Sequence, residues 1–265
     1  MTALVAYIEG VGLLGPGLPN WTVGAPIFAG CVPLVYAPTI LPTAHALPAA
    51  ERRRTGEVVK LALAIGYEAA GHAACDLSAL TTVFSSSGGD GHNCHEICQT
   101  LASTDRQVSP TRFHNSVHNA AAGYWSIATA STAPSTVLCA YDASFTAGLL
   151  ETMTHVTVLQ VAAMLIAYDV GYPAPLHAKR PMEQPFGVAL VVSPKVGERS
   201  LAKVEVALAD SRVDGLDDSN LERLRKGVPA GRSLPLLRLL ARRQAGVVHL
   251  EYLDRIAVRA QITPC

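Results

Sequence analysis

Hydrophobic and polar positions along the chain follow the two periods that distinguish strands from helices. Apolar runs of strand length occur at 3–8, 81–84, 137–140, 164–169, 187–193, 203–209 and 247–262. Stretches with helical spacing occupy 49–71, 92–101, 143–161, 221–226 and 234–243. The segment 110–122 fits neither period. Because runs of both kinds alternate, the pattern predicts an α/β layered fold.

The helical stretch 49–71 has the clearest amphipathic pattern. Apolar residues three and four positions apart should form its buried face, namely Val58, Leu61, Ala62, Ile65 and Ala69. Gly71 is expected to end the helix, because glycine readily adopts the left-handed conformation found there.

Residues 12–50 break both periods. They are rich in proline and glycine, which excludes a long helix. The pattern therefore predicts a long irregular loop after a first strand that ends at Gly10. Such a loop is unusual in a compact domain and often has a function.

Composition narrows the class of protein. The 265 residues are 49% hydrophobic and 16% charged, which is typical of a globular chain with a large core. Because 21 basic residues balance 21 acidic ones, no overall field favours nucleic acid or an anionic membrane. The N-terminus lacks signal-peptide features, and the longest apolar run near the middle is too short to span a bilayer. A cytoplasmic protein with six reduced cysteines is expected.

Charge is distributed unevenly. Residues 10–50 contain no Asp, Glu, Lys or Arg, whereas residues 198–259 hold 21 of the 42 charges. The first stretch should therefore be packed or covered by a partner, and the second should form a solvated layer.

Gly10-Val-Gly12-Leu-Leu-Gly15 matches the GxGxxG pattern of dinucleotide sites and follows a strand. Such a site also needs a helix that opens there and an acidic residue about twenty positions later. Two prolines disfavour the helix, and no acidic residue occurs at that spacing. The pattern favours a simple glycine turn.

His92, Cys94, His95 and Cys98 lie within seven residues, a density that can bind zinc. On a helix, Cys94 and Cys98 share one face, while His95 lies about 100° from Cys94. No second pair of ligands lies nearby. We therefore expect these four side chains to lie on the surface of a helix or to be buried thiols, and not to bind a metal.

His114 and His118 have the spacing of a zinc pair on a helix, but Asn115 stands where a zinc protease needs glutamate. The chain also lacks the GxSxG nucleophile elbow and the Lys-Ser/Thr of a phosphate-binding loop. No metal and no cofactor are expected.

Several segments, taken together, resemble the β-ketoacyl synthase family of the thiolase-like superfamily. They are ALVAYIEGVGLLGPG, ERRRTGEVVKLALAIGYEAA, TTVFSSSGG, SPTRFHNSVHNAAAGYWSIAT, DASFTAGLLE, AMLIAYD and FGVALVVSP. Within that family the chain is most similar to the small group labelled chain length factor, found with aryl polyene and xanthomonadin-type pigment pathways. The resemblance implies one domain over 1–265, with 1–193 like the N-terminal half of a synthase and 194–265 a charged C-terminal α/β cap.

Departures from the family pattern bear on activity. The resemblance places the family's cysteine nucleophile at Ala140, counted back from Gly148, while Cys139 lies one residue early. A thiolate there would be favoured by a helix N-terminus. After residue 150 the chain has only His155, His177 and His249, and none matches the family's catalytic histidines. The resemblance therefore implies a subunit without condensing activity.

The resemblance also implies partners. They are an active β-ketoacyl synthase, paired through central strands, and an acyl carrier protein. The residues expected at the acyl tunnel or interface are Phe113, His114, Asn115, His118, Asn119, Tyr124, Trp125, Asp142 and Phe145, with Arg52, Arg53 and Arg54 as candidates for carrier docking.

Three alternatives stay open. The aromatic, Asn and His residues can simply pack a core. The chain can instead be a small acyltransferase or thioesterase that uses Cys139 or Ser144 with His118 or His114. It can also be a free-standing module that binds an acyl chain or an acyl carrier.

Overall fold

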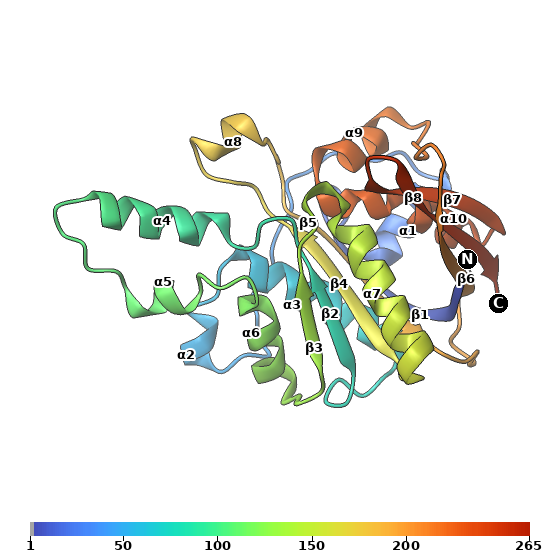
Figure 1. Ribbon diagram of the computed structural model, residues 1–265, viewed down its shortest axis with the longest axis horizontal. Coiled ribbons are helices and arrows are strands. Elements are labelled where there is room, and N and C mark those ends of the chain that lie inside the picture. The colour runs from blue at the N-terminus through green and yellow to red at the C-terminus, as the bar shows by residue number, and fades with distance from the viewer. Residues whose placement is uncertain (1–2) are drawn as a thin grey trace.

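The computed structural model describes residues 3–265, which form one mixed sheet of eight strands flanked by helices (Figure 1). The strand order is β3-β2-β4-β5-β1-β6-β8-β7. β2 pairs in parallel with β3 and β4, and every other pair is antiparallel. The strands are β1 (Leu4–Leu14), β2 (Thr81–Ser85), β3 (Ser135–Leu138), β4 (Ala163–Asp169), β5 (Phe186–Ser193), β6 (Ala202–Ala209), β7 (Gly246–Leu253) and β8 (Ile256–Pro264).

Helices cover both faces of the sheet. α3 and α6 pack on one face, and α1, α7 and α10 pack on the other. The helices are α1 (Trp21–Ala29), α2 (Ala49–Arg52), α3 (Glu57–Ala73), α4 (Gly91–Ala102), α5 (Pro110–His114), α6 (Ala120–Thr129), α7 (Ser144–Leu159), α8 (Leu176–Lys179), α9 (Ser219–Gly227) and α10 (Leu234–Arg242), with short 3-10 turns η1 (Tyr141–Ala143) and η2 (Pro229–Ser233). Within residues 3–265, none of the helices combines the length and apolar character needed to cross a bilayer.

Burial explains the two kinds of strand pattern. β4 is buried at every position and β5 at all but its last, because both are central and covered by helices on both faces. Such strands read as continuous apolar runs. β6 lies outside this centre, and its first six residues alternate between buried and half-buried. The predicted α/β fold is confirmed, while several predicted elements differ in length or are divided in two.

β1 does not end at Gly10 as the sequence pattern predicted, but continues through the glycines to Leu14. α3 packs so closely on β1 that a Cβ on Gly10 would collide with the Ala69 carbonyl, and one on Gly12 with the Ile65 carbonyl. Glycine lacks a Cβ and allows this approach. The GxGxxG pattern here serves helix–strand packing.

Residues 12–50 are not wholly irregular, because α1 forms within them. Asn20 caps the helix, and its side-chain oxygen accepts a hydrogen bond from the Val23 N–H at 2.8 Å. Gly30, with a φ of 83°, ends the helix after nine residues. The proline-rich composition concealed a short helix and excluded only a long one.

The helix expected over 49–71 is two helices. The chain breaks after α2, where the Thr55 hydroxyl donates to the Arg52 carbonyl at 2.9 Å, and α3 starts after Gly56. α3 continues past Gly71 to Ala73, and its C-cap residue Ala74 adopts the left-handed conformation with a φ of 50°. The predicted apolar face is confirmed, since all five of its residues are buried.

The remaining segments complete the layers. The region 110–122 contains α5 and the start of α6, and the strand-like stretch 247–262 is the hairpin of β7 and β8. α4 and α5 project together from the body as an arm, and the excursion between β4 and β5 carries α8 (Figure 1).

Candidate functional site

The candidate site lies where β2, β3 and β4 end. These three strands are parallel, so their carboxyl ends meet at one edge of the sheet. The chain leaves β3 at Leu138, passes Cys139 and Ala140, and enters η1 and then α7. This turn is where the sequence places the vestigial nucleophile position. We call residues 139–144 the β3–α7 turn.

Hydrogen bonds of Ser144 hold the β3–α7 turn. Its hydroxyl accepts from the Ala140 N–H at 3.0 Å and donates to the Tyr141 carbonyl at 2.7 Å. Tyr141 has a φ of 52°, which is uncommon for a residue other than glycine, and its ring is largely exposed. Ala140 supplies no nucleophile, and the Ser144 hydroxyl is engaged with the backbone.

Asp142 connects the turn to two arginines. Its carboxylate accepts a hydrogen bond from Arg180 at 2.6 Å and lies 3.6 Å from Arg232. The Arg180 guanidinium also stacks over the Tyr141 ring, 3.7 Å from the ring centroid. Arg180 comes from the excursion between β4 and β5, and Arg232 comes from η2. The turn is thus joined to two distant segments by charge-assisted contacts.

Asp169 is a buried carboxylate at the carboxyl end of β4, on the same edge of the sheet as the β3–α7 turn. It accepts hydrogen bonds from the Ser87 N–H at 2.8 Å and the Ala230 N–H at 2.9 Å. Burial raises the pKa of Asp169 to about 6, although these hydrogen bonds act in the opposite direction. Its two oxygens connect the glycine-rich turn after β2 with η2.

The predicted interface segment lies beside this edge. The His118 ring is 3.2 Å from the Ser86 carbonyl. Asn115 is buried, donates to the Arg54 carbonyl at 2.8 Å and accepts from the Tyr124 hydroxyl at 3.1 Å. His114 is exposed and meets the Tyr124 ring edge-on. Asn119, also exposed, precedes α6 but makes no side-chain cap.

The predicted tunnel aromatics differ in exposure. Trp125 and Phe145 are fully buried within the chain, in the cores on opposite faces of the sheet. Tyr124 is buried too, whereas Phe113 is 70% exposed. Phe113 lines a groove of about 510 Å³ between α5 and α6, whose rim includes the exposed Val117. A tunnel role for any of the four remains a prediction.

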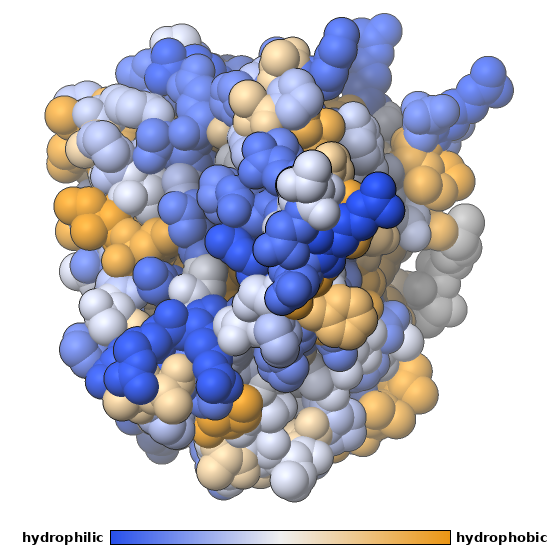
Figure 2. Space-filling view, turned by 90° about the vertical axis from the view of Figure 1, so that its left-hand side faces the viewer, coloured by the Kyte–Doolittle hydropathy of each residue, from blue (hydrophilic) through white to orange (hydrophobic). Residues whose placement is uncertain are grey.

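The arginine run lies at the end of α2. Arg53 and Arg54 are exposed, Arg52 is partly buried, and Arg54 pairs with Glu51 at 3.4 Å. Arg53 and Arg54 line a polar cavity of about 950 Å³ between α3, the arm and the α8 excursion. The face of the molecule at the left of Figure 1 shows separate hydrophobic patches among hydrophilic side chains (Figure 2).

The histidines and cysteines considered as metal ligands do not converge. His92, Cys94, His95 and Cys98 all lie on α4 in the arm, whereas His114 ends α5 and His118 follows it. Among residues 3–265, no group of three or more His, Cys, Asp or Glu side chains could hold a metal ion.

Comparison with known families identifies the class of protein. The family described as beta-ketoacyl synthase, N-terminal domain, matches residues 33–249, which is most of the chain. The chain belongs to this family. A comparison with curated proteins gives no match.

Solved structures show the same thiolase-like fold. One is the ketosynthase ApeO in complex with its chain length factor ApeC from Xenorhabdus doucetiae, with 21% identity, a TM-score of 0.73, and coverage of 97% of this chain and 99% of that one. The ishigamide ketosynthase/chain length factor gives 15% identity, a TM-score of 0.71 and coverage of 98% and 99%. A beta-ketoacyl synthase from Burkholderia phymatum STM815 gives 12% identity, a TM-score of 0.57 and coverage of 92% and 71%.

Three residues of the site escaped the sequence analysis. Asp169 had a usable signal, because it is an acidic residue directly after an apolar run. Arg180 and Arg232 had none, since each lies far along the chain from Asp142 and belongs to no recognisable motif. Only the folded chain brings these charges together.

Proposed function

We propose that this protein is a non-catalytic subunit that pairs with an active β-ketoacyl synthase and shapes its acyl tunnel, as a chain length factor does. The observation that carries the proposal is the β3–α7 turn. Ala140 stands where the family places its nucleophile, and Asp142 at the same turn is paired with Arg180 and Arg232. The methyl side chain of Ala140 cannot form the acyl thioester that a condensing synthase needs.

The free edge of β3 and the apolar groove support a partner on this side, whereas the central strands expected from the resemblance already have neighbours on both sides. β3 ends the sheet, and Phe113, Val117 and Ile127 expose large apolar side chains around the groove between α5 and α6. Exposed apolar surface of this kind, beside an unpaired strand, fits association with another chain. Phe113 would reach a tunnel formed at that contact.

The neighbouring structures and the arginine cavity support the choice of partners. Two of the similar structures are described as a ketosynthase with its chain length factor. The cavity beside Arg53 and Arg54 also includes Lys60 and Arg112, but Arg54 and Arg112 already pair with Glu51 and Glu96. Arg53 and Lys60 would attract an acidic carrier protein, although the same walls also carry acidic side chains. We propose that product formation belongs to polyene or fatty-acid-type biosynthesis.

The enzymatic alternative has less support. Within residues 3–265, the hydrogen bonds of Ser144 go to Ala140 and Tyr141, and His118 is bonded to the Ser86 carbonyl. A nucleophile and its base need to lie within hydrogen-bond reach, and neither Cys139 nor Ser144 has such a histidine partner. The exposed position of Cys139 favours this alternative.

The test is product length in the reconstituted pair of this subunit and its synthase. Phe113→Ala should shift products to longer chains, because an exposed side chain is removed without a core defect. Steric fit discriminates between chains that differ by one methylene by only about 1–3 kcal/mol. The distribution of product lengths should therefore shift without a complete change of product. Val158→Ala, at an exposed position near the end of α7, is the control. Cys139→Ala should leave yield and length unchanged.

Two results would count against the proposal. One is an unchanged length distribution for Phe113→Ala in a pair that is still assembled. The other is loss of product for Cys139→Ala at unchanged assembly, which would favour the enzymatic alternative. Product lengths are read by mass spectrometry, and assembly by size-exclusion chromatography.

A further inference from the structure

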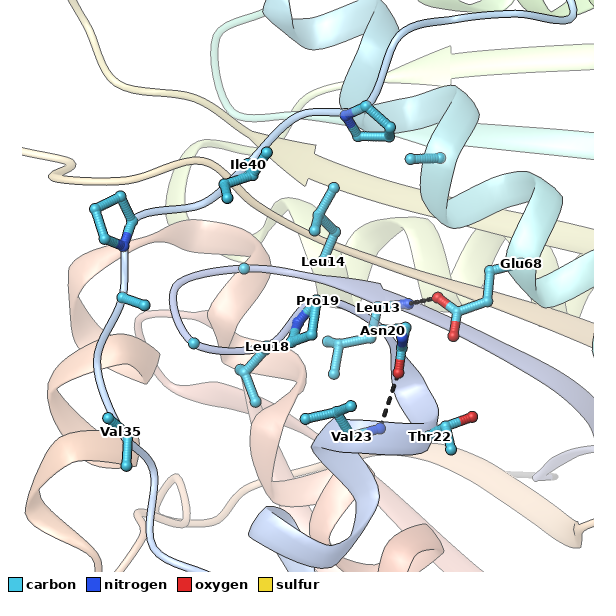
Figure 3. Close-up of a pocket in the computed structure, with 16 residues that line it drawn as sticks. Leu13, Leu14, Leu18, Pro19, Asn20, Thr22, Val23, Val35, Ile40 and Glu68 are labelled. Carbon is cyan, nitrogen blue, oxygen red and sulfur yellow. Dashed lines mark hydrogen bonds between the residues drawn. The ribbon is translucent and has the colours of Figure 1, made fainter.

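A second apolar cavity lies outside the β3–α7 turn and includes none of its residues. It has a volume of about 790 Å³, within the range of small-molecule sites. Its walls are the end of β1, the start of α1, one side of α3 and the extended strap of residues 35–42 (Figure 3). Most of these walls come from the segment 10–50, which contains no Asp, Glu, Lys or Arg.

The walls offer no positive charge to a ligand. Of the sixteen lining residues, Glu68 alone is ionisable. Its two oxygens already accept hydrogen bonds from the Leu13 N–H at 2.8 Å and the Trp21 N–H at 2.6 Å. A ligand with an anionic headgroup therefore gains no partner inside the cavity.

Part of the backbone in the walls has no free hydrogen-bond donor. Pro19, Pro38 and Pro42 have no N–H to offer. The N–H groups of Gly15, Gly17, Leu18 and Val23 already donate within the chain, to Leu18, Ala37, Gly15 and Asn20 respectively. These parts of the wall favour an apolar occupant.

The rim is apolar and exposed. Val35 is 74% exposed, Ile40 is 83% exposed, and Val23 is 42% exposed. Hydrogen bonds hold the strap at two points, Ala37, which accepts from Gly17, and Thr39, which bonds to Gln184 and Pro185. An occupant in contact with these side chains would remove their apolar surface from water.

We infer that this cavity binds a single hydrocarbon chain whose headgroup stays in solvent. The inference goes beyond the proposed function, because it concerns the isolated subunit and residues away from the β3–α7 turn. The chain can be borne by a carrier thioester or belong to a free lipid, since both present the same hydrocarbon chemistry.

The experiment is calorimetric titration of the isolated protein with 1-octanol, 1-nonanol and 1-decanol. Affinity should rise roughly fourfold per added methylene, the value expected for burial of one CH₂ group. Decanoate should bind no more tightly than decanol. Decanoyl-pantetheine as tight as decanol would assign a carrier-borne chain, and weaker binding would assign a free lipid.

Matched variants locate the site. Val35→Asp should weaken decanol binding by roughly tenfold or more, because a charge replaces an apolar contact. Val196→Asp, at an exposed valine in another loop, should have no effect. Ala64→Trp fills the cavity from α3 and should also abolish binding, with the fold checked by circular dichroism.

Absence of decanol binding to the wild type would overturn the inference. So would equal effects of Val35→Asp and Val196→Asp. Loss of binding in Phe113→Asp, with Val35→Asp unaffected, would place the hydrocarbon in the groove between α5 and α6 instead. None of these results depends on a synthase, so they are independent of the test of the proposed function.

Discussion

The two edges of the sheet are built differently. At β7, Asp214 covers the edge, because its N–H donates to the His249 carbonyl at 3.0 Å and its carboxylate accepts from the His249 N–H at 2.7 Å. At β3, the carbonyls of Pro134 and Leu138 bond to β2, so the backbone groups of Ser135 and Val137 face outward. One edge is closed by the chain itself, and the other is left for pairing.

This difference indicates where a partner chain can add. Proteins protect sheet edges with charges, bulges or covering loops, since an unpaired edge associates readily. β7 has a covering residue and a register shift between Leu250 and Leu253. β3 has neither, and apolar side chains surround it. The asymmetry supports assembly with the synthase through β3.

The largest effect is expected from proline at the β3 edge. Val137→Pro removes an outward N–H and leaves the ladder to β2 intact. An unmatched acceptor in the partner strand should cost about 1–3 kcal/mol, or roughly 5–150-fold in Kd. Val247→Pro, at an outward position of β7, is the matched control and should leave the pair intact. Equal weakening by both prolines, measured by analytical ultracentrifugation, would contradict the distinction between the edges.

A smaller effect is expected from uncovering β7. Asp214→Ala leaves the His249 N–H without its acceptor, which should lower the free energy of unfolding by about 1 kcal/mol. It should also introduce self-association that Asp217→Ala does not, because Asp217 is exposed and lies outside the edge contact. Urea unfolding and light scattering measure the two effects. A variant that stays monomeric at high concentration would show that Asp214 does not protect the edge.

An effect of similar size is a pH dependence set by Asp169, which connects the turn after β2 with η2. Its pKa of about 6 lies above the ordinary value of 3.8, so the native state binds more protons than the unfolded state between these values. This contribution to stability is complete below about pH 4 and is lost as the pH rises through 6. Lowering the pH from 7 to 5 should therefore add about 1 kcal/mol from this group.

The measurement for Asp169 compares urea unfolding of the wild type and Asp169→Asn at pH 7 and pH 5. The variant should lack the gain at pH 5, because it has no proton to take up at this position. It should also be less stable at pH 7, since its amide cannot accept from both Ser87 and Ala230. Parallel pH profiles for the two proteins would exclude the assigned role.

Local pattern predicted much of the fold. The face of α3 and the buried strands β4 and β5 follow from the spacing of apolar residues, which reports local environment. α1 was missed because Pro26 and two glycines hide a helix that depends on the Asn20 cap. The early end predicted for β1 was wrong. Its glycines do not end the strand but allow close packing of α3, which lies more than fifty residues further along the chain.

The site was harder to predict than the fold. The assignment of Ala140 as the nucleophile position came from resemblance to a family and stays a prediction; the residue lies between β3 and the 3-10 turn η1. The contacts of Asp142 with Arg180 and Arg232 depend on long-range folding, which no local period encodes. Whether Phe113 or Tyr124 reaches a tunnel depends on a second chain, so those roles remain predictions.

The close contact of β1 with α3 has a mechanical consequence. Gly10 faces Ala69 and Gly12 faces Ile65, so the helix runs opposite to the strand. Two residues of a strand advance about 7 Å, and four residues of a helix advance about 6 Å. The distance between the two glycines therefore nearly matches the distance between Ile65 and Ala69. Helix and strand interlock there, and α3 cannot slide along β1 without a collision. The pair should move as one rigid body, and any adjustment on assembly should occur in the arm, the strap and the α8 excursion.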